Sequence, residues 1–254
     1  MTYTDEDVVS KIEFTKTLIE DAFEDIEQGY VPNDRLHIAK RSIGKKLKAI
    51  GIYHGLLGNK SKMRTTFSRA GEYYIEGVRL QLDLAETDPG ENLEEVPLTL
   101  AELLRVAVLS ADEDLLANAV QLTRGFDESY LDEYPETHYK YYYAKAYAEI
   151  LAGVDSKATV ESLSASIPED NNDVAMYYRC LLRTLRGLNT LDEGETEAGL
   201  SGLLSNFADK FSEQIGPAGH VCVPVVAFAV TAQRRGMDVW PDSRFVPEIF
   251  RPDQ

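Results

Sequence analysis

The spacing of apolar residues predicts helices along almost the whole chain. Ile19, Phe23 and Ile26 recur at intervals of four and three residues, which places them on one helix face, and the pattern stops before Pro32. The same reasoning predicts helices over residues 4–28, 34–57, 63–85, 97–110, 112–124, 128–152, 156–165, 171–188, 195–214 and 222–235. No segment alternates Val, Ile and Thr with the period of a strand, so we expect no sheet.

Short connections between most of these helices predict an all-α fold of stacked antiparallel hairpins. Gly51, Gly58, Phe67 and Ala70 lie at the spacings found in tetratricopeptide repeats, in which small residues let the two helices of a hairpin approach closely. The chain therefore resembles a degenerate tetratricopeptide-like array, and an irregular helical domain is the alternative. Because repeat units bury their faces only by stacking, we expect residues 1–254 to form a single domain.

The composition excludes one broad class of function. The chain of 254 residues has 43 acidic and 26 basic side chains, and its net charge of −17 repels the phosphates of nucleic acids. We therefore expect no direct binding of nucleic acid. Two interpretations of the acidity remain open: solvation of the protein in a salt-adapted cytosol, and attraction of a basic partner.

Several features predict a cytoplasmic location. No stretch of about 18 uncharged apolar residues occurs, and the N-terminal residues are acidic where a signal peptide is basic. The two cysteines, Cys180 and Cys222, are too few for a disulfide framework, which agrees with a reducing compartment. We therefore expect no association with a membrane.

The charge is distributed unevenly along the chain. Ten basic residues and no acidic residue lie between Arg35 and Gly71, whereas all 43 acidic residues lie in the rest of the chain. We call this segment the basic island. On the second predicted helix, Arg41, Lys45 and Lys48 follow each other at intervals of four and three residues and share one face. These three residues form what we call the basic stripe.

Two interpretations of the basic stripe remain open. In the first, it pairs inside the molecule with an acidic stripe of matching spacing on the first predicted helix, formed by Glu20, Glu24 and Glu27. In the second, it faces outward and meets an acidic partner protein. The first interpretation gives the stripe a structural role, and the second makes it a binding site.

Tyrosines are concentrated between residues 130 and 147. Tyr139, Tyr143 and Tyr147 share one face of the predicted helix, whereas Tyr141 and Tyr142 point elsewhere. We regard Tyr141 and Tyr142 as candidates for a protein-binding surface, because tyrosine combines a large rigid area with a polar tip. The alternative is that these rings fill grooves between stacked helices.

The sequence contains no motif for catalysis, metal binding or phosphate binding. The four histidines are dispersed, and His220 and Cys222 have a spacing that is poor for two ligands of one metal ion. Neither a nucleophile elbow nor a phosphate-binding loop occurs. We therefore predict that the protein is not an enzyme and that it uses no metal and no cofactor.

The last 40 or so residues have a pattern of their own. A nearly all-apolar helix begins near Pro224 and ends at Arg235 and Gly236. A tail over residues 237–254 follows, and its aromatic residues are Trp240, Phe245 and Phe250. Because an exposed run with three aromatic rings promotes self-association, we expect the tail to pack on the helical body.

This C-terminal pattern resembles the immunity protein 49 family of polymorphic toxin systems, whose members are all-helical and of similar size. The matching residues, in the apolar helix, its Arg-Gly end and a Ser-x-x-Val-Pro segment, are Pro224, Ala227, Ala229, Arg235, Gly236, Ser243, Val246 and Pro247. The resemblance is specific over roughly 40 residues and general, as helical hairpins, over the rest of the chain. It implies a cytoplasmic antitoxin that binds and blocks a toxin domain, with no active-site residues of its own.

Two function classes follow from these observations. The first is the immunity protein, whose partner is a toxin domain. An acidic toxin would meet the basic stripe, and a basic nuclease would meet acidic faces that mimic the phosphate backbone. The second is a tetratricopeptide-like scaffold that binds a peptide or a regulatory protein in the groove of its array.

We expect salt to stabilise the fold, because it screens repulsion among 43 acidic side chains more than it weakens surface ion pairs. Thermal unfolding in about 0.1 M and about 2 M KCl measures the effect, and the midpoint should rise with the salt concentration. A midpoint that falls at the higher concentration would contradict the interpretation of the acidity as salt adaptation.

Overall fold

The computed structural model describes residues 4–88, 92–170, 172–211 and 219–253, and within these ranges it contains helices and no strand. The α-helices are α1 (Asp5–Glu27), α2 (Leu36–Leu56), α3 (Lys60–Thr87), α4 (Val96–Ser110), α5 (Glu113–Arg124), α6 (Tyr130–Glu133), α7 (His138–Leu151), α8 (Lys157–Ser166), α9 (Asp173–Thr190), α10 (Glu193–Phe211) and α11 (Val223–Arg234). Short 3-10 helices cover Asn33–Arg35, Pro135–Thr137 and Glu248–Phe250.

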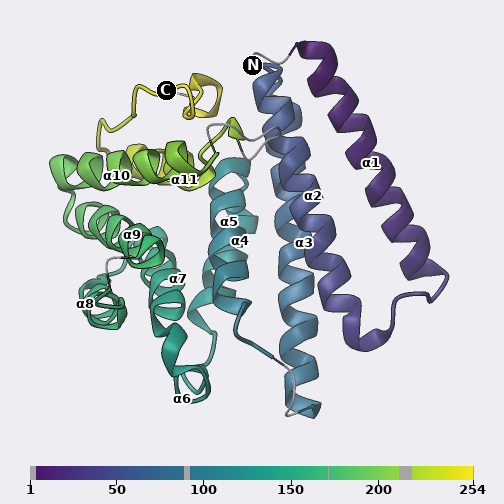
Figure 1. Ribbon diagram of the computed structural model, residues 1–254, viewed down its shortest axis with the longest axis horizontal. Helices are drawn as coiled ribbons and strands as arrows, with labels where there is room; N and C mark the ends of the chain where they lie inside the picture. Colours follow the sequence, from purple (N-terminus) through teal and green to yellow (C-terminus); the bar gives the residue numbers. More distant parts are fainter. Residues whose placement is uncertain (1–3, 89–91, 171, 212–218, 254) are drawn as a thin grey trace.

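Successive helices pack as hairpins, which pair α2 with α3, α4 with α5, α7 with α8, and α9 with α10. Helices α1 to α5 run side by side, and α10 and α11 lie crosswise to them, with α11 near one end of α4 (Figure 1). The α4/α5 hairpin lies between the α2/α3 hairpin and α7. The prediction of an all-α fold built from stacked helical hairpins is therefore confirmed.

Glycines let the helices of two hairpins approach closely. A Cβ atom at Gly51 would lie 3.0 Å from the Phe67 ring on α3, and Gly58 turns the chain between α2 and α3 with a φ of +73°. In the α9/α10 hairpin, a Cβ atom at Gly187 would overlap the backbone of Thr196 on α10. The spacing of Gly51 and Phe67 in the sequence thus reflects direct contact between two helices.

One predicted helix is interrupted. We expected a continuous helix over residues 128–152, but α6 ends at Glu133 and α7 begins at His138. Pro135 causes the break, because its ring disfavours the helical conformation at Tyr134, whose φ and ψ are −127° and 59°. The interruption separates the tyrosines of α6 from those of α7.

The main core extends from α2 to the C-terminal tail and includes α11. Val226 and Phe228 of α11 are fully buried, and the Phe228 ring lies 4.8 Å from the Tyr147 ring on α7. Because α11 is apolar on most sides, it needs neighbours on most sides, and it packs against α4, α9 and α10. A smaller cluster joins α1 to α2 through residues such as Ile12 and Ile43.

The aromatic residues of the tail lie against the helical body. Phe245 and Phe250 are buried, and the Phe250 ring is 6.4 Å from the Phe67 ring on α3. Trp240 is partly exposed and packs against the main core. The tail therefore extends the core rather than projecting into solvent.

The tail also neutralises part of the basic island. Lys60 and Arg64 of α3 form ion pairs with Asp253 at 2.6 and 2.8 Å. Lys40 of α2 pairs with Glu76 of α3 at 2.8 Å. Three of the ten basic residues between residues 35 and 71 thus pair with two carboxylates of the same molecule.

We expect Phe250→Ala to lower the free energy of unfolding by about 3 kcal/mol, because it opens a cavity at a side chain that is 4% exposed. Phe14→Ala on α1 is the matched control, since Phe14 is 62% exposed and its loss should change stability by less than about 0.5 kcal/mol. Urea unfolding followed by circular dichroism measures both variants. If Phe250→Ala changed the free energy of unfolding as little as Phe14→Ala is expected to, the Phe250 contact would contribute nothing to the folded unit.

Candidate functional site

A cleft with two adjoining lobes lies over α4, between α2 on one side and α9 on the other. The polar lobe has a volume of about 640 Å³, and its lining includes Arg41, Lys45, Lys48, Tyr74, Glu102 and Arg105. The apolar lobe has a volume of about 540 Å³, and its lining includes Ile52, Val174, Leu203, Phe207, Val221 and Val223. The first helix of each of the four hairpins, α2, α4, α7 and α9, contributes side chains to the cleft.

A partly buried ion network lies where the two lobes meet. Glu102 of α4 is held between two cations, because Lys48 Nζ lies 2.6 Å from its Oε2 and Arg105 pairs with its Oε1. The Arg105 side chain is 8% exposed and donates a hydrogen bond of 2.6 Å to the Tyr143 hydroxyl on α7. Helices α2, α4 and α7 therefore meet through two charged residues of α4.

The network determines the charge state of its members. Burial alone would raise the pKa of Glu102, but attraction to Lys48 and Arg105 lowers it to about 2, so the carboxylate is ionised at neutral pH. Burial alone would lower the pKa of Arg105, but Tyr143 and Glu102 raise it above its ordinary value. Burial raises the pKa of the Tyr143 and Tyr177 hydroxyls, which therefore stay protonated.

Tyrosine rings pack together on the side of the cleft formed by α7 and α9. Tyr178 makes edge contacts with Tyr143 and Tyr177, with ring centroids 5.9 and 5.7 Å apart. The Tyr139 ring lies 4.5 Å from the Tyr178 ring in a similar arrangement. Because each ring is held by its neighbours, this wall of the cleft is rigid.

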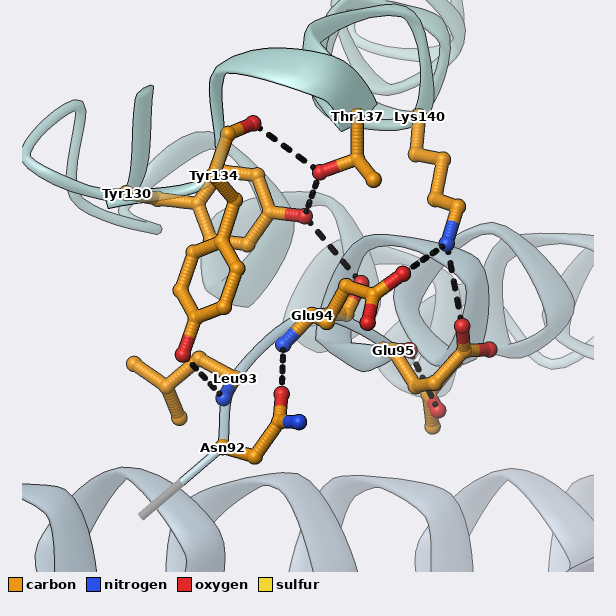
Figure 2. A network of polar contacts seen from close by, with 9 residues as sticks. Asn92, Leu93, Glu94, Glu95, Tyr130, Tyr134, Thr137 and Lys140 are labelled. Carbon is orange, nitrogen blue, oxygen red and sulfur yellow. Dashed lines mark hydrogen bonds and ion pairs between the residues drawn. The ribbon is translucent and has the colours of Figure 1, made fainter. Parts of the chain in front are cut away.

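A second polar network positions the N-terminal end of α4 (Figure 2). Lys140 of α7 lies 3.0 Å from a carboxylate oxygen of Glu94 and 3.0 Å from one of Glu95. Tyr134 accepts a hydrogen bond from the backbone of the segment before α4, and Tyr130 donates one of 3.1 Å to the carbonyl oxygen of Glu94. These contacts tie the start of α4 to α6 and α7, and Glu95, which lines the polar lobe, shares Lys140 with Glu94.

The basic stripe lies along the polar lobe. Arg41, Lys45 and Lys48 all line this lobe, so the structure brings together the three residues that the sequence indicated. Lys48 binds Glu102, and Lys45 is exposed. The Arg41 side chain extends from α2 across Gly77 of α3. A Cβ atom added at Gly77 would lie only 2.7 Å from Arg41 Cγ.

The packing of α2 contradicts the first interpretation of the basic stripe, in which it pairs with an acidic stripe on α1. The acidic residues expected to form it are exposed on α1, and they are Glu20, Glu24 and Glu27. Lys48 pairs instead with Glu102 of α4. The reason is that α2 packs on α1 through its opposite face, which carries Ile43, Leu47 and Ile50. The stripe is therefore turned away from α1.

Tyr141 and Tyr142 lie outside the lining of the cleft. Tyr141 is 2% exposed, and its ring stacks on the Tyr130 ring with centroids 5.9 Å apart, so it belongs to the core rather than to a partner surface. Tyr142 is partly buried and makes an edge contact with the His138 ring. These two tyrosines therefore do not extend the site formed by the basic stripe.

Sequence reasoning missed the two charged residues at the centre of the site. Glu102 and Arg105 are opposite charges three residues apart in the otherwise uncharged and mostly apolar segment 96–110. Charged residues in a helix that is buried on most sides require partners, so this pattern was a usable signal. The identity of the partners depends on which helices pack on α4.

The described part of the chain contains no group of three or more His, Cys, Asp or Glu side chains arranged to hold a metal ion. None of the described helices is long and apolar enough to cross a membrane. Comparisons with protein-family models, with curated proteins and with solved structures found no match. The cleft and the C-terminal residues therefore provide the basis for assigning a function.

We expect the ionised form of Glu102 to make the fold sensitive to acid. The pKa of this carboxyl group is about 2 in the folded protein against an ordinary value of 4.5. Its contribution to stability, at most about 3 kcal/mol, is therefore complete above about pH 5 and is lost as the pH falls toward 2.

Urea unfolding at a series of pH values tests this with two variants. Glu102→Gln should be less stable than the wild type at pH 7 and should lose less stability between about pH 5 and 2. Glu20→Gln, at an exposed position of α1, should follow the wild-type curve. A Glu102→Gln curve parallel to the wild-type curve would show that this carboxylate gains nothing from its two cations.

Proposed function

We propose that this protein is a cytoplasmic immunity protein that binds a cognate toxin domain and neutralises it by protein–protein contact. The observation that carries the proposal is the cleft, which combines cationic side chains, tyrosine rings and an apolar lobe. Such a combination is typical of surfaces that bind proteins. Because partly buried ion pairs hold Lys48, Glu102 and Arg105 in place before binding, association requires little ordering of these side chains.

The residues that resemble the immunity protein 49 family support this proposal. Pro224, in the first turn of α11, lines the apolar lobe, and Arg235 donates a hydrogen bond of 2.9 Å to the carbonyl oxygen of Ile150 on α7. Gly236 ends this segment with a φ of +84°, and Val246 is buried in the tail. Pro224 thus forms part of the cleft wall, and Arg235 holds the end of α11 on α7.

The proposed activity is binding and requires no reacting side chain. Glu102 is held ionised between two cations, and burial keeps the Tyr143 hydroxyl protonated. Neither group exchanges protons near neutral pH, as a general acid or base must. Both are suited to holding the cleft in one arrangement.

A peptide-binding scaffold is the second candidate, and one observation favours it. The first helices of four successive hairpins line the cleft, as the inner helices of a tetratricopeptide-like array line its groove. In this case the partner would be a peptide or a regulatory protein. The two candidates differ in whether binding stops a toxic activity.

A neutralisation assay tests the proposal. The partner to examine is the C-terminal domain of a large secreted protein encoded beside the gene for this chain. Expression of that domain alone should arrest growth of a bacterial host, and co-expression with this chain should restore growth. The purified pair should form a complex with a Kd of about 10 nM or lower, because a toxin must be held at low concentration.

Two variants control the assay. Phe14→Ala changes an exposed residue far from the cleft lining and should protect as well as the wild type. Gly187→Leu places a side chain against the backbone of Thr196, which should disrupt the α9/α10 hairpin and abolish protection. A toxin that stays active in the presence of wild-type chain would contradict the immunity function, and capture of a regulatory protein instead would favour the scaffold.

A further inference from the structure

We propose that the cleft receives an acidic segment of the partner protein, with a carboxylate in the polar lobe and a neighbouring apolar side chain in the apolar lobe. This inference assigns the chemistry of the partner, and it rests on the proposed function only in identifying that partner as a toxin domain. Three observations support the inference independently of the proposed function. They are the unpaired buried donors, the positive charge of the polar lobe and the neighbouring apolar lobe.

Two buried hydrogen-bond donors that line the polar lobe have no acceptor among the described residues. They are the Tyr74 hydroxyl and Arg105 Nε. Tyr74 is 1% exposed, and its ring lies so close to Gly44 of α2 that an added Cβ atom would be 3.3 Å away. Burial raises the pKa of Tyr74, so its hydroxyl stays protonated and can donate.

Unpaired buried polar atoms are uncommon in folded proteins. Of the seven that occur among the described residues, these two donors line the polar lobe, where an acceptor on a ligand would pair with them. A carboxylate is well suited, because its two oxygens accept several hydrogen bonds at once. Hydrogen bonds that involve an ionised group are also stronger than those between neutral groups. The donors thus indicate an anionic oxygen ligand in the polar lobe.

The polar lobe has an excess of positive charge. Its lining holds four cationic side chains, Arg41, Lys45, Lys48 and Arg105, against two carboxylates, Glu95 and Glu102. Lys48 and Arg105 pair with Glu102, and Glu95 shares Lys140 with Glu94 (Figure 2). Lys45 is exposed, and no acidic group of the described ranges pairs with it. A carboxylate that enters the lobe would therefore interact with Lys45 as well as with the unpaired donors.

The apolar lobe fits the side chain next to that carboxylate. Ile52, Leu203 and Phe207 line it, and Val174, also in its lining, is 47% exposed. A partner that covers Val174 removes apolar area from water, whereas Ile52 and Leu203 are already buried. Because the two lobes share lining residues, one extended segment of a few residues can occupy both.

A single-stranded nucleic acid also carries anions, but it fits the cleft less well. Its phosphate backbone offers no aliphatic side chain to the apolar lobe. The net charge of −17 also repels a polyanion more strongly than a protein segment with one or two carboxylates. The observations therefore favour an acidic protein segment.

Fluorescence anisotropy with a labelled peptide tests the site on the intact chain. The probe is an acetylated peptide with two glutamates followed by leucine and phenylalanine. It should bind, and replacing both glutamates with glutamine, or both apolar residues with serine, should weaken binding by at least about fivefold. A probe that does not bind at about 1 mM, or that binds equally well after either replacement, overturns the proposal.

Variants of the protein locate the peptide. Lys45→Glu should raise the Kd at least about tenfold, and Tyr74→Phe should raise it about threefold or more. Tyr74→Phe should not lower the thermal midpoint, because the hydroxyl it removes has no partner in the folded chain. Lys62→Glu is the matched control, since it makes the same charge change at an exposed position of α3 outside the cleft lining and should leave the Kd unchanged.

The outcomes separate this proposal from the proposed function. Equal peptide binding by the wild type and Lys45→Glu overturns the acidic segment, and so does tighter binding of a short oligothymidylate than of the peptide. A toxin domain that is neutralised equally by the wild type and Lys45→Glu retains the immunity function but overturns this use of the cleft. Peptide binding with the expected variant effects, without neutralisation of the toxin, retains the cleft assignment and rejects the immunity function.

Discussion

The placement of two opposite charges on α4, the buried Arg105 and the partly buried Glu102, is the constraint on which the rest of the structure depends. Glu102 and Arg105 lie on a helix whose other side chains are mostly apolar and buried against α3, α5, α7 and α11. Removal of one partner from a buried ion pair typically costs about 3–5 kcal/mol, because the other charge is left uncompensated. Helix α4 can therefore be buried only where Lys48 arrives from α2 and Tyr143 from α7. The network specifies how three hairpins meet, whatever its net contribution to stability.

The cleft follows from the same arrangement. The charged groups of α4 keep the space between α2 and α9 polar, while α10 and the start of α11 supply the apolar lobe beside it. Two glycines bring further side chains to this space. Gly44 lets α2 lie close to the Tyr74 ring, and Gly77 lets Arg41 lie across α3. Features that serve packing thus also shape a surface suited to a ligand.

The sequence was sufficient for the helices because the signals that define them are local. The period of apolar residues and breakers such as Pro32 and Gly58 lie within a few residues of each helix end. The expectation of one continuous helix over residues 128–152 was an error, although the signal that contradicts it, Pro135, is local and visible in the sequence. The partners of the charged residues were not predictable in this way. Residue spacing shows that Arg41, Lys45 and Lys48 share a face, but it does not show which helix lies opposite that face. Matching spacing on α1 therefore suggested a pairing that the packing of α2 excludes.

The acidity of the whole chain and the positive charge of its cleft are compatible when distance and salt are considered together. At about 0.1 M salt, charges interact over a Debye length of about 10 Å, so the acidic surface would repel an acidic partner before contact. At about 1 M salt the length falls to about 3 Å, and this repulsion is largely screened. Ion pairs and hydrogen bonds formed inside a partly buried cleft are screened much less, because little solvent separates the groups. A salt-rich cytosol would thus allow one molecule to use dense surface carboxylates for solubility and a basic cleft for recognition. The two interpretations of the charge, solvation and partner binding, then describe different parts of the same surface.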